Sequence, residues 1–505
     1  MQRVDRRTIR SFGIPGPVLM ERAGLAVVSR ITERFGGSKV LVIAGTGNNG
    51  GDGIMAAREL RNIGYRTSVL IAGKKEKLSR DAAAQYRSAD AMGVPIRFYS
   101  SFIKPRPEEL HGAIIVDALV GTGLAKDIKG SLARTIDTIN DSGCPVVSVD
   151  IPSGVSADTG QVLGTAVQAD FTVTFGTLKR GHLLYPGAEL SGKVFVHDIG
   201  FPRQLLGEIT CNVPGSHEMR LLIPERPPDS HKGDFGHLLS IAGSRGKTGA
   251  AFMSAEAALR AGAGLVTLAA PEALSDIYQA RVTEAMVLPL PSGAGGNLSF
   301  EALEGILAFA SEKATAIAMG PGLGQDKETT RLVRDVLENS PVPVVLDADG
   351  INALGSKAAS LLSNTRAPVV LTPHPGEFSR ISGMSVPKIE ADRPGNALAF
   401  AKKCGAYVVL KGAPTVIAGP EGELFINTTG GSGLSKGGTG DILTGMIGAL
   451  CAMGMSPLEA SLLGSYMHGL AGDLAASALG DFSTMASDVI GHIPDAFRSL
   501  SGEDV

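Results

Sequence analysis

Continuous apolar runs recur along this chain, and most of them end at a glycine or a polar residue that precedes a segment with helical spacing. In the first half these runs are 39–45, 67–73, 113–119, 145–151 and 171–176. Such runs are typical of strands that are covered on both faces of a sheet. Helices are expected over 56–63 and 81–92. Strands that alternate with helices predict a mostly parallel, doubly wound α/β sheet.

The same alternation starts again in the second half, after a proline-rich break. The expected strands there are 237–243, 264–270, 315–320, 343–349, 368–373 and 406–412, and the expected helices are 250–261, 440–450 and 457–479. The 505 residues are too many for one ordinary domain. We therefore place a linker near 204–220 and predict two α/β domains, residues 1–210 and residues 215–505.

The composition excludes several classes of protein. The net charge is -3, and no stretch is dense in lysine or arginine, so nucleic acid is not an expected partner. No apolar run reaches the length of about 20 residues that a membrane span needs. The four cysteines form no CxxC pair, and the N-terminus lacks a secretory signal, so a cytoplasmic protein is expected. We also expect a homo-oligomer, although no residue pattern specifies one.

The densest motif of the first half is the run Gly45–Gly53, at a strand-to-helix turn. It satisfies GxGxxG, which lets backbone amides approach a pyrophosphate at a helix N-terminus, so a Rossmann dehydrogenase is one interpretation. Against it, the next strand is followed by Lys74 and Lys75, with no acid for a ribose hydroxyl. Asn48, Asn49 and Asp52 instead suit a polar substrate or a hard cation.

Polar residues also end two further strands of the first half. Asp117 is followed by Gly121-Thr122-Gly123, and Asp150 is followed by Ser153. An aspartate at such a place can simply cap a helix. Because open α/β sheets bind ligands at the carboxyl ends of their strands, three polar strand ends favour a binding site.

The second half carries Gly437-Gly438-Thr439-Gly440-Asp441 at the start of an expected helix. Free amides at a helix N-terminus can hold a phosphoryl group. Asp441 can accept a proton from a substrate hydroxyl, or it can cap the helix. The run 243–249 is not a P-loop, because that motif needs glycine where Ile241 stands. The nucleotide would therefore bind as in ribokinase-like folds.

Three other strand ends of the second half are polar. His374, between two prolines, can donate a hydrogen bond to a substrate oxygen. Asp347 and Asp349 end a strand and can help to hold Mg²⁺, or one of them caps the next helix. Lys411–Thr415 ends another strand and can contact a nucleotide phosphate or ribose.

Residues 1–205 resemble NAD(P)H-hydrate epimerases, with a Rossmann-like fold. The resemblance rests on LMERAG (19–24), Asn48–Asp52, VDALVGTG, SVDIPSG and FGTLKRGHLLYPG (175–187). It implies that Asp150 binds substrate and is the acid/base group, and that Asn49, Asp117 and Ser153 hold K⁺. The substrate-binding residues that it implies are Asn48, Asn49, Gly50, Gly51, Asp52, Gly121, Thr122, Gly123, Leu124, Ala125, Lys126, Asp127 and Asp150.

Residues 215–500 resemble ADP-dependent NAD(P)H-hydrate dehydratases, with a ribokinase-like α/β fold. The motifs are SHKGDFGHLLSIAGS (230–244), AMGPGLG (318–324), VLDADG, LTPHPGE, LKGAPT and GGTGDILTG. The resemblance implies that Ala250, Gly322, His374 and Asp441 contact the hydrate and that Asp441 is the base. The implied nucleotide contacts are Lys411, Gly412, Ala413, Pro414, Thr415 and Gly440.

Together the two resemblances imply repair of hydrated NADH and NADPH, NADHX and NADPHX. The first domain would interconvert the R and S hydrates at C6 by ring opening. The second would phosphorylate the S hydrate from ADP, with Mg²⁺, and then release phosphate. The preference for ADP over ATP comes only from the resemblance. A ribokinase-like kinase with a regulatory N-terminal domain, or a non-catalytic nucleotide sensor, are the alternatives.

Overall fold

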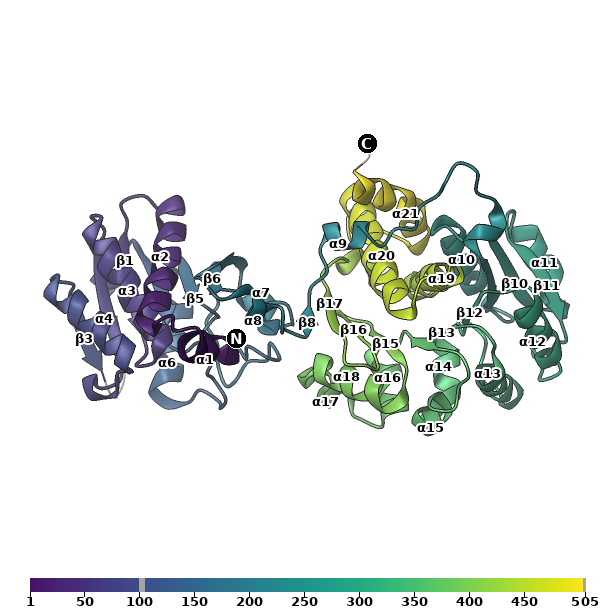
Figure 1. Ribbon diagram of the computed structural model, residues 1–505, viewed down its shortest axis with the longest axis horizontal. Helices are drawn as coiled ribbons and strands as arrows, with labels where there is room; N and C mark the ends of the chain where they lie inside the picture. Colours follow the sequence, from purple (N-terminus) through teal and green to yellow (C-terminus); the bar gives the residue numbers. More distant parts are fainter. Residues whose placement is uncertain (100–104, 503–505) are drawn as a thin grey trace. The chain divides into compact units, whose positions relative to one another are not determined.

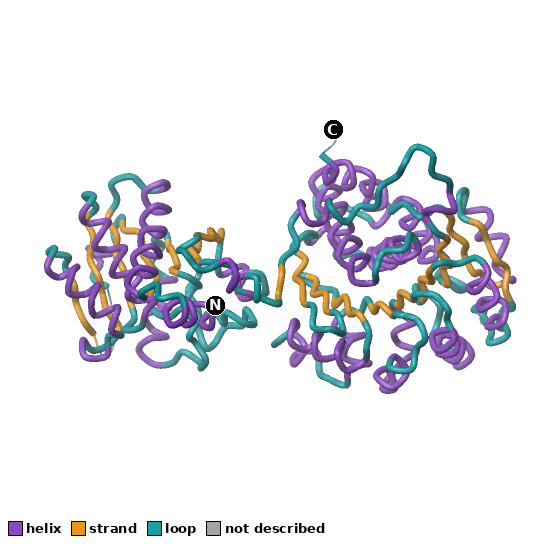
Figure 2. Tube along the Cα trace, viewed as in Figure 1, coloured by secondary structure: helices purple, strands orange, loops and turns teal. Residues whose placement is uncertain are grey.

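The computed structural model describes residues 1–99 and 105–502, and the chain divides into two compact units, Met1–Ile209 and Thr210–Val505 (Figure 1). Each unit is an α/β domain with one sheet between helices, as the tube trace in Figure 2 shows. Within the described ranges, no helix has both the length and the apolarity that crossing a bilayer requires.

The first unit contains a seven-stranded sheet in which every neighbouring pair is parallel. Its strands are β1 (Lys39–Ala44), β2 (Arg66–Ala72), β3 (Ile96–Tyr99), β4 (Ala113–Ala118), β5 (Val146–Val149), β6 (Phe171–Phe175) and β7 (Lys193–His197). The order β3-β2-β1-β4-β5-β6-β7 reverses direction between β1 and β4. Loops at such a switch point diverge and leave a crevice for a ligand. This arrangement confirms the predicted Rossmann-like doubly wound sheet.

Both faces of this sheet are covered, which explains its continuous apolar strands. Helices α2 (Gly16–Arg34), α3 (Asn48–Asn62) and α4 (Arg80–Ala91) pack on one face, and α6 (Gly130–Asn140) packs on the other. The shorter elements of the unit are α1 (Gln2–Ser11), η1 (Lys75–Lys77), α5 (Pro107–Leu110), η2 (Arg180–His182), α7 (Gly187–Leu190) and α8 (Arg203–Leu206).

The second unit has a ten-stranded sheet with the order β11-β10-β9-β12-β13-β14-β15-β16-β17-β8. Its strands are β8 (Cys211–Asn212), β9 (His237–Ile241), β10 (Leu265–Pro271), β11 (Met286–Leu290), β12 (Ala316–Met319), β13 (Val344–Leu346), β14 (Val369–Leu371), β15 (Tyr407–Leu410), β16 (Thr415–Ala418) and β17 (Leu424–Asn427). β16 runs antiparallel to both of its neighbours, β15 and β17, and the other pairs among the described strands of this sheet are parallel. The switch point of this sheet lies between β9 and β12.

Helices also cover both faces of the second sheet. On one face lie α10 (Thr248–Arg260), α19 (Thr439–Ala452), α20 (Pro457–Leu479) and α21 (Ala486–Ser501). On the other lie α12 (Ala302–Glu312), α13 (Lys327–Asn339), α14 (Ala348–Leu354), α15 (Ala358–Leu362), α16 (Pro375–Ser382) and α18 (Arg393–Cys404). The remaining elements are α9 (Ser216–Arg220), η3 (Lys232–Phe235), η4 (Glu272–Leu274), α11 (Ser275–Arg281), η5 (Gly355–Lys357), α17 (Val386–Ala391) and η6 (Ser432–Leu434).

Two expectations about local structure are wrong. The helix expected from residue 56 begins at Asn48, because the polar run after β1 is already helical. The strand expected to reach residue 349 ends at Leu346, which places Asp349 inside α14. The stretch 204–220, where the linker was expected, contains part of α8 and the whole of β8 and α9, and the boundary between the two units falls inside it, after Ile209.

Candidate active sites

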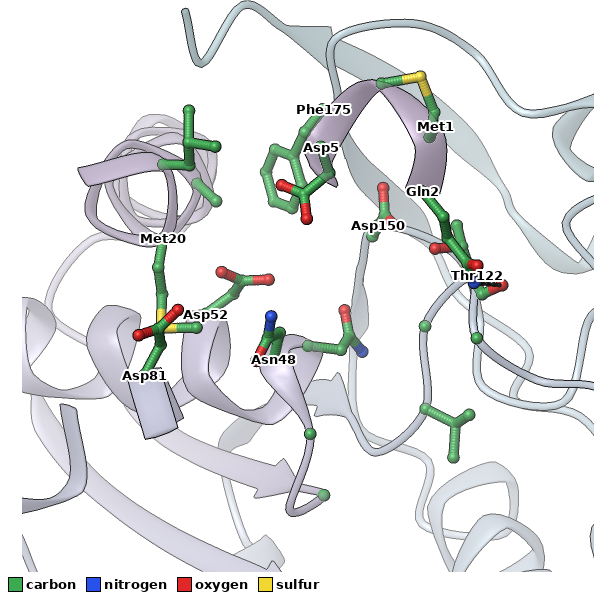
Figure 3. A pocket seen from close by; sticks show the side chains of 18 of the residues that line it. Met1, Gln2, Asp5, Met20, Asn48, Asp52, Asp81, Thr122, Asp150 and Phe175 are labelled. Carbon is green, nitrogen blue, oxygen red and sulfur yellow. Dashed lines mark hydrogen bonds between the residues drawn. The ribbon is translucent and has the colours of Figure 1, made fainter. Parts of the chain in front are cut away.

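A cavity of about 590 Å³ opens at the switch point of the first sheet (Figure 3). The loops after β1 and β4 approach closely here: a Cβ on Gly45 would lie 2.0 Å from the carbonyl oxygen of Leu119. The predicted site residues that line the cavity are Asn48, Asn49, Asp52, Gly121, Thr122, Gly123 and Asp150. Leu124, Ala125, Lys126 and Asp127 follow in the same loop but lie outside the lining, as do Gly50 and Gly51.

The first turn of α3 brings Asn48 and Asn49 to the cavity wall. The Asn48 Oδ1 accepts a hydrogen bond from Ser79 Oγ at 2.7 Å. Both polar atoms of the Asn49 side chain are buried and make no hydrogen bond within the described residues. Because an unpaired buried amide costs free energy, this side chain is suited to a ligand that supplies its partner.

Asp117, near the end of β4, and Ser153, in the loop after β5, form a buried pair next to the segment that follows β4. Ser153 Oγ donates to Asp117 Oδ1 at 2.6 Å, and Ser153 N donates to Asp117 Oδ2 at 2.8 Å. Ser148 Oγ donates to Oδ2 at 2.9 Å. Burial raises the pKa of the Asp117 carboxyl, against the opposing effect of these bonds. Asp117 is therefore a structural centre that joins β4, β5 and the loop after β5.

The surroundings of Asn49 and Ser153 present oxygen donors. Asn49 offers an unpaired amide oxygen, and the Ser153 hydroxyl lies 3.1 Å from the carbonyl oxygen of Val120. These are oxygen donors, which suit a hard cation. No group of three or more histidine, cysteine, aspartate or glutamate side chains with metal-binding geometry occurs in the described part of the chain. These oxygen donors thus suit a hard cation rather than a transition metal.

Asp150 follows β5 directly, and its φ of 65° places a non-glycine residue in the left-handed region. Such strain concentrates at functional sites. The carboxylate accepts hydrogen bonds from Thr174 Oγ1 at 3.0 Å and from Lys179 Nζ. Burial alone would raise the pKa of Asp150, but the Lys179 ammonium holds it below its ordinary value. Asp150 is therefore kept ionised at neutral pH.

Lys179 was not predicted as a site residue, although it lies in the motif FGTLKRGHLLYPG (175–187) on which the epimerase resemblance rests. Its Nζ also donates to Thr174 Oγ1 at 2.6 Å and to the carbonyl oxygen of Phe175 at 3.0 Å. His182 supports the same corner, since its Nε2 lies 2.9 Å from the carbonyl oxygen of Asp150. Helix α1 was missed as well, and it brings Gln2 and Asp5 into the cavity lining.

The second site lies at the switch point between β9 and β12. Ala250 stands in the first turn of α10, which follows β9, and Gly322 follows β12 with a φ of 64°. A Cβ on Gly322 would lie 3.2 Å from the Cβ of Ala250 and 3.0 Å from that of Lys247. The structure thus brings the two predicted substrate contacts, Ala250 and Gly322, side by side.

Helix α19 begins with the predicted glycine-rich motif. Gly438 is the N-cap residue, and its φ of 100° favours glycine. Asp441 lies in the first turn, but Gly438 is the N-cap residue and the Asp441 side chain makes no capping hydrogen bond with a described residue, so the helix-cap interpretation is wrong. Burial, reinforced by the Asp347 carboxylate, raises the pKa of Asp441 to about 7. A carboxyl group with this pKa is matched to general-base work near neutral pH.

An ion pair joins Asp347 and Lys411, with Lys411 Nζ 2.7 Å from Asp347 Oδ1. Thr444 Oγ1 donates to the other carboxylate oxygen at 2.8 Å. Asp347 occupies the N-cap position of α14 without capping it. Lys411 also lies near Gly440, where an added Cβ would be 3.3 Å from Nζ. Asp347 after β13, Lys411 after β15 and Gly440 in the first turn of α19 therefore lie close together.

Asp349 and His374 differ from their expected settings. Asp349 Oδ2 accepts from Lys247 Nζ at 3.1 Å and from Gly324 N at 2.9 Å, so it neither ends a strand nor caps a helix. His374 is the N-cap of α16, and its Nδ1 accepts from Gly376 N at 3.0 Å. Because Nδ1 is an acceptor, a neutral ring would carry its proton on Nε2, which lies 3.4 Å from Glu377 Oε1.

The predicted nucleotide segment Lys411, Gly412, Ala413, Pro414 and Thr415 begins directly after β15 and ends at the start of β16. Arg393, which the sequence did not single out, is buried beneath it. Its guanidinium donates to the carbonyl oxygens of Leu410 at 3.2 Å, Lys411 at 3.0 Å and Ala413 at 3.4 Å. Glu377 was missed too, and its Oε2 lies 4.0 Å from Lys411 Nζ.

The fold and the two sites define an α/β enzyme with a Rossmann-like domain before a ribokinase-like domain, each with its ligand site at a switch point. The family model described as NAD(P)H-hydrate dehydratase matches residues 238–495, and the one described as YjeF-related protein N-terminus matches residues 16–181. The chain belongs to the family of bifunctional NAD(P)H-hydrate repair enzymes, which confirms the expected pairing of an epimerase with a dehydratase.

Individual comparisons agree with this assignment. The bifunctional NAD(P)H-hydrate repair enzyme Nnr of Thermofilum pendens is 40% identical, over 98% of this chain and 95% of that protein. A crystal structure of the ADP/ATP-dependent NAD(P)H-hydrate dehydratase from Bacillus subtilis, co-crystallised with ATP and Mg²⁺, is 33% identical, with a TM-score of 0.51 over 57% of this chain and 98% of that chain. A ribokinase-like superfamily protein from Enterococcus faecalis is 29% identical, with a TM-score of 0.50 over 58% and 97%.

Proposed function

We propose that Asp150 is the acid/base group of the epimerase site and that the cavity at the β1/β4 switch point holds the hydrated nicotinamide. The observation that supports this most directly is the Asp150–Lys179 ion pair, which keeps the carboxylate ionised on the cavity wall. An ionised Asp150 takes the proton of the C6 hydroxyl. The N1–C6 bond then breaks, the aldehyde forms, and closure on the other face gives the other epimer.

The substrate contacts come from the first turn of α3 and from the loop after β4. Asn48, Asn49 and Asp52 form the first group, and Gly50 and Gly51, which lie outside the cavity lining, complete the turn between them. Gly121, Thr122 and Gly123 reach the cavity, and Leu124–Asp127 complete their loop. We assign K⁺ to Asn49, Asp117 and Ser153, where the cation would hold the loops after β4 and β5 in place. The unpaired Asn49 amide supports this assignment.

In the dehydratase site we assign the catalytic base to Asp441. Its pKa of about 7, its freedom from capping and its place at the glycine-rich start of α19 support this role. Asp441 removes the proton of the S hydrate's C6 hydroxyl while that oxygen attacks the β-phosphorus of ADP. The P–O bond to the α-phosphate breaks, and AMP leaves. Free amides of the α19 N-terminus stabilise the charge on the phosphoryl group.

The second step needs no further protein nucleophile. The lone pair of ring nitrogen N1 expels phosphate from C6, and loss of a C5 proton restores the C5=C6 bond of NADH or NADPH. Phosphate leaves far more easily than hydroxide, so a site built like a kinase serves a dehydratase. The overall products are the repaired dinucleotide, AMP and phosphate.

The remaining hydrate and nucleotide contacts of the dehydratase site are assigned to the motifs that lie close to Asp441. We assign the hydrate contacts to Ala250, Gly322 and His374, and the nucleotide contacts to Gly440 and the segment Lys411–Thr415. Mg²⁺, when bound with the nucleotide, would neutralise phosphate charge. The carboxylate of Asp347, which pairs with Lys411, offers a hard oxygen donor of the kind that this ion prefers. The Bacillus subtilis dehydratase was crystallised with ATP and Mg²⁺, which supports nucleotide and Mg²⁺ use here.

We further propose that the protein works in the cytoplasm as a homo-oligomer. All four cysteines lie in the described part of the chain and form no disulfide there, which suits a reducing compartment. Light scattering on the purified protein tests the oligomeric state.

One experiment separates this function from its alternatives. The purified full chain is mixed with S hydrate and ADP, and the products are followed by absorbance at about 340 nm and by mass spectrometry. Restored NADH with AMP and phosphate is expected. A stable phosphate ester would indicate a kinase, and an unchanged hydrate would indicate a nucleotide sensor. ATP in place of ADP, and R hydrate in place of S hydrate, measure the nucleotide preference and the epimerase.

A further inference from the structure

Asp52 is an acidic side chain of the epimerase cavity that the protein leaves without a partner. It is the fifth residue of α3 and lines the cavity wall, where Figure 3 shows its carboxylate beside the same space that Asp5 and Asp150 face. It makes no hydrogen bond and no ion pair with any described residue of the chain. A partly buried carboxyl group without a partner is costly for stability, so a structural role does not explain it.

Asp52 and Asp150 occupy opposite electrostatic environments in one cavity. Burial, followed by the charges of Asp150 and Asp5, raises the pKa of Asp52 well above its ordinary value. The Lys179 ammonium holds the pKa of Asp150 down. Two carboxyl groups whose environments push their pKa values apart divide the roles of acid and base between them. Asp52 therefore retains its proton to higher pH than Asp150 does.

Ring opening of the hydrate requires two proton transfers at different atoms. The C6 hydroxyl loses a proton as the C6 oxygen becomes a carbonyl, and N1 gains a proton as the N1–C6 bond breaks. In the closing step the same protons move back. A single carboxylate that serves both atoms would have to move between them, whereas two groups on the cavity wall can serve them at once.

We infer that Asp52 is the second acid/base residue of the epimerase, which protonates N1 while Asp150 deprotonates the C6 hydroxyl. This inference rests on the proposed role of Asp150. When the ring closes on the other face, the Asp52 carboxylate takes the N1 proton back and Asp150 returns its proton to oxygen. Both residues end the cycle in their starting state, and no co-reactant is needed.

The charged groups around Asp52 come from four other parts of the fold. Asp5 from α1, Asp81 from α4, Asp150 after β5 and Lys179 before η2 all line the cavity. Asp5 shares the acidic surroundings, since burial and then Asp81 raise its pKa. Asp52 is distinguished from Asp5 and Asp81 by the segment that carries it, Asn48–Asp52, which also presents the unpaired Asn49 amide to the ligand.

The test compares Asp52→Asn, Asp52→Glu and Asp150→Asn in the full chain, with Asp90→Asn on the exposed surface of α4 as the matched control. Interconversion of R and S hydrates is followed by chromatography without ADP, across a range of pH. Asp52→Asn should lower kcat by about 10²–10⁴-fold with little change in KM. It should also remove the alkaline limb of the pH profile, which reports the acid form of Asp52, while Asp52→Glu keeps that limb.

The possible results distinguish a failure of the role inferred for Asp52 from a failure of the role proposed for Asp150. A near-normal kcat in Asp52→Asn, or a rise in KM alone, would show that Asp52 only binds substrate. An alkaline limb that persists in Asp52→Asn would also overturn the inference, because another group would then be the acid. If Asp150→Asn keeps both its rate and its acidic limb, the proposed base is wrong. Thermal unfolding of each variant shows whether the epimerase domain is folded. If Asp52→Asn is not folded, the rate and the pH profile of Asp52→Glu test the inference instead.

Discussion

The ammonium group of Lys179 forms an ion pair with the carboxylate of Asp150, and only 5% and 16% of the two side chains are exposed. The two positions are 29 apart in the sequence. Removal of the cation would leave a buried carboxylate without its counter-charge, which is strongly unfavourable. The pair therefore sets both the ionisation of Asp150 and its orientation in the cavity.

Lys179→Met should slow epimerisation at neutral pH and shift the acidic limb of its pH–rate profile to higher pH. The physical reason is that burial raises the pKa of Asp150 once the Lys179 ammonium no longer lowers it. Lys179→Arg, which keeps the positive charge, should leave the limb near its original pH. Dehydration of S hydrate by the same sample controls for the integrity of the other domain. An unmoved limb in Lys179→Met would contradict the electrostatic role.

Asn49→Ala should lower epimerase activity and abolish its response to K⁺. The Asn49 amide has no partner in the described structure, so its loss removes no hydrogen bond within the protein and should change the free energy of unfolding little. Activity is measured at increasing K⁺ with tetramethylammonium replacing it at constant ionic strength. Asp117→Asn is the contrasting variant, because its carboxylate holds Ser148 and Ser153 and its change should also destabilise the fold. A K⁺ response that survives in Asn49→Ala would remove this residue from the cation site.

Asp441→Asn should reduce dehydration by about 10²–10⁴-fold, the usual contribution of a general base. In the wild type the rate should rise with pH toward a plateau above about 7, where Asp441 is ionised. ADP should still bind, because the Lys411 ammonium and the α19 amides remain. A soluble Asp441→Asn protein with near-normal turnover would refute this assignment, and combined loss of turnover and ADP binding would make Asp441 a nucleotide ligand.

The same substitution should change stability in a way that depends on pH. The pKa of Asp441 rises from 3.8 to about 7 on folding, so the folded protein holds a proton that the unfolded chain releases between these values. The wild type thus loses stability as pH rises through this window. Asparagine cannot ionise, so the Tm of Asp441→Asn relative to wild type should increase from pH 4 to pH 8. Equal Tm differences at both ends would contradict the raised pKa.

Lys411→Met should destabilise the second domain by about 3–5 kcal/mol, the usual effect of breaking a buried ion pair. Asp347, whose side chain is 2% exposed, would then carry an unpaired charge. Lys411→Met combined with Asp347→Asn should recover much of the stability but not the activity. Urea unfolding of the single and double variants measures the coupling free energy. If the double variant is no more stable than Lys411→Met, the two side chains do not depend on each other.

The sequence predicted the fold class and many strand ends, because buried parallel strands read as continuous apolar runs and their loops must be polar. It did not predict the short antiparallel strands β16 and β17, which have four residues each and little periodicity. It also missed Lys179 and Arg393, whose partners are distant in the chain or are backbone carbonyls. His374 was interpreted only as a ligand contact, although it is the N-cap of α16 and forms a capping box with Glu377.

The short strand β8 has a consequence for the order in which the second domain can form. Cys211 and Asn212 pair with Leu424 and Phe425. One of the first segments of this domain to be synthesised therefore cannot pair until one of the last strands of the sheet has been synthesised. Contacts between such distant segments slow folding and prolong exposure of unpaired backbone. A fragment that starts at residue 215 would leave the edge of β17 open to other chains. We expect fragments that begin at Thr210 to be more soluble.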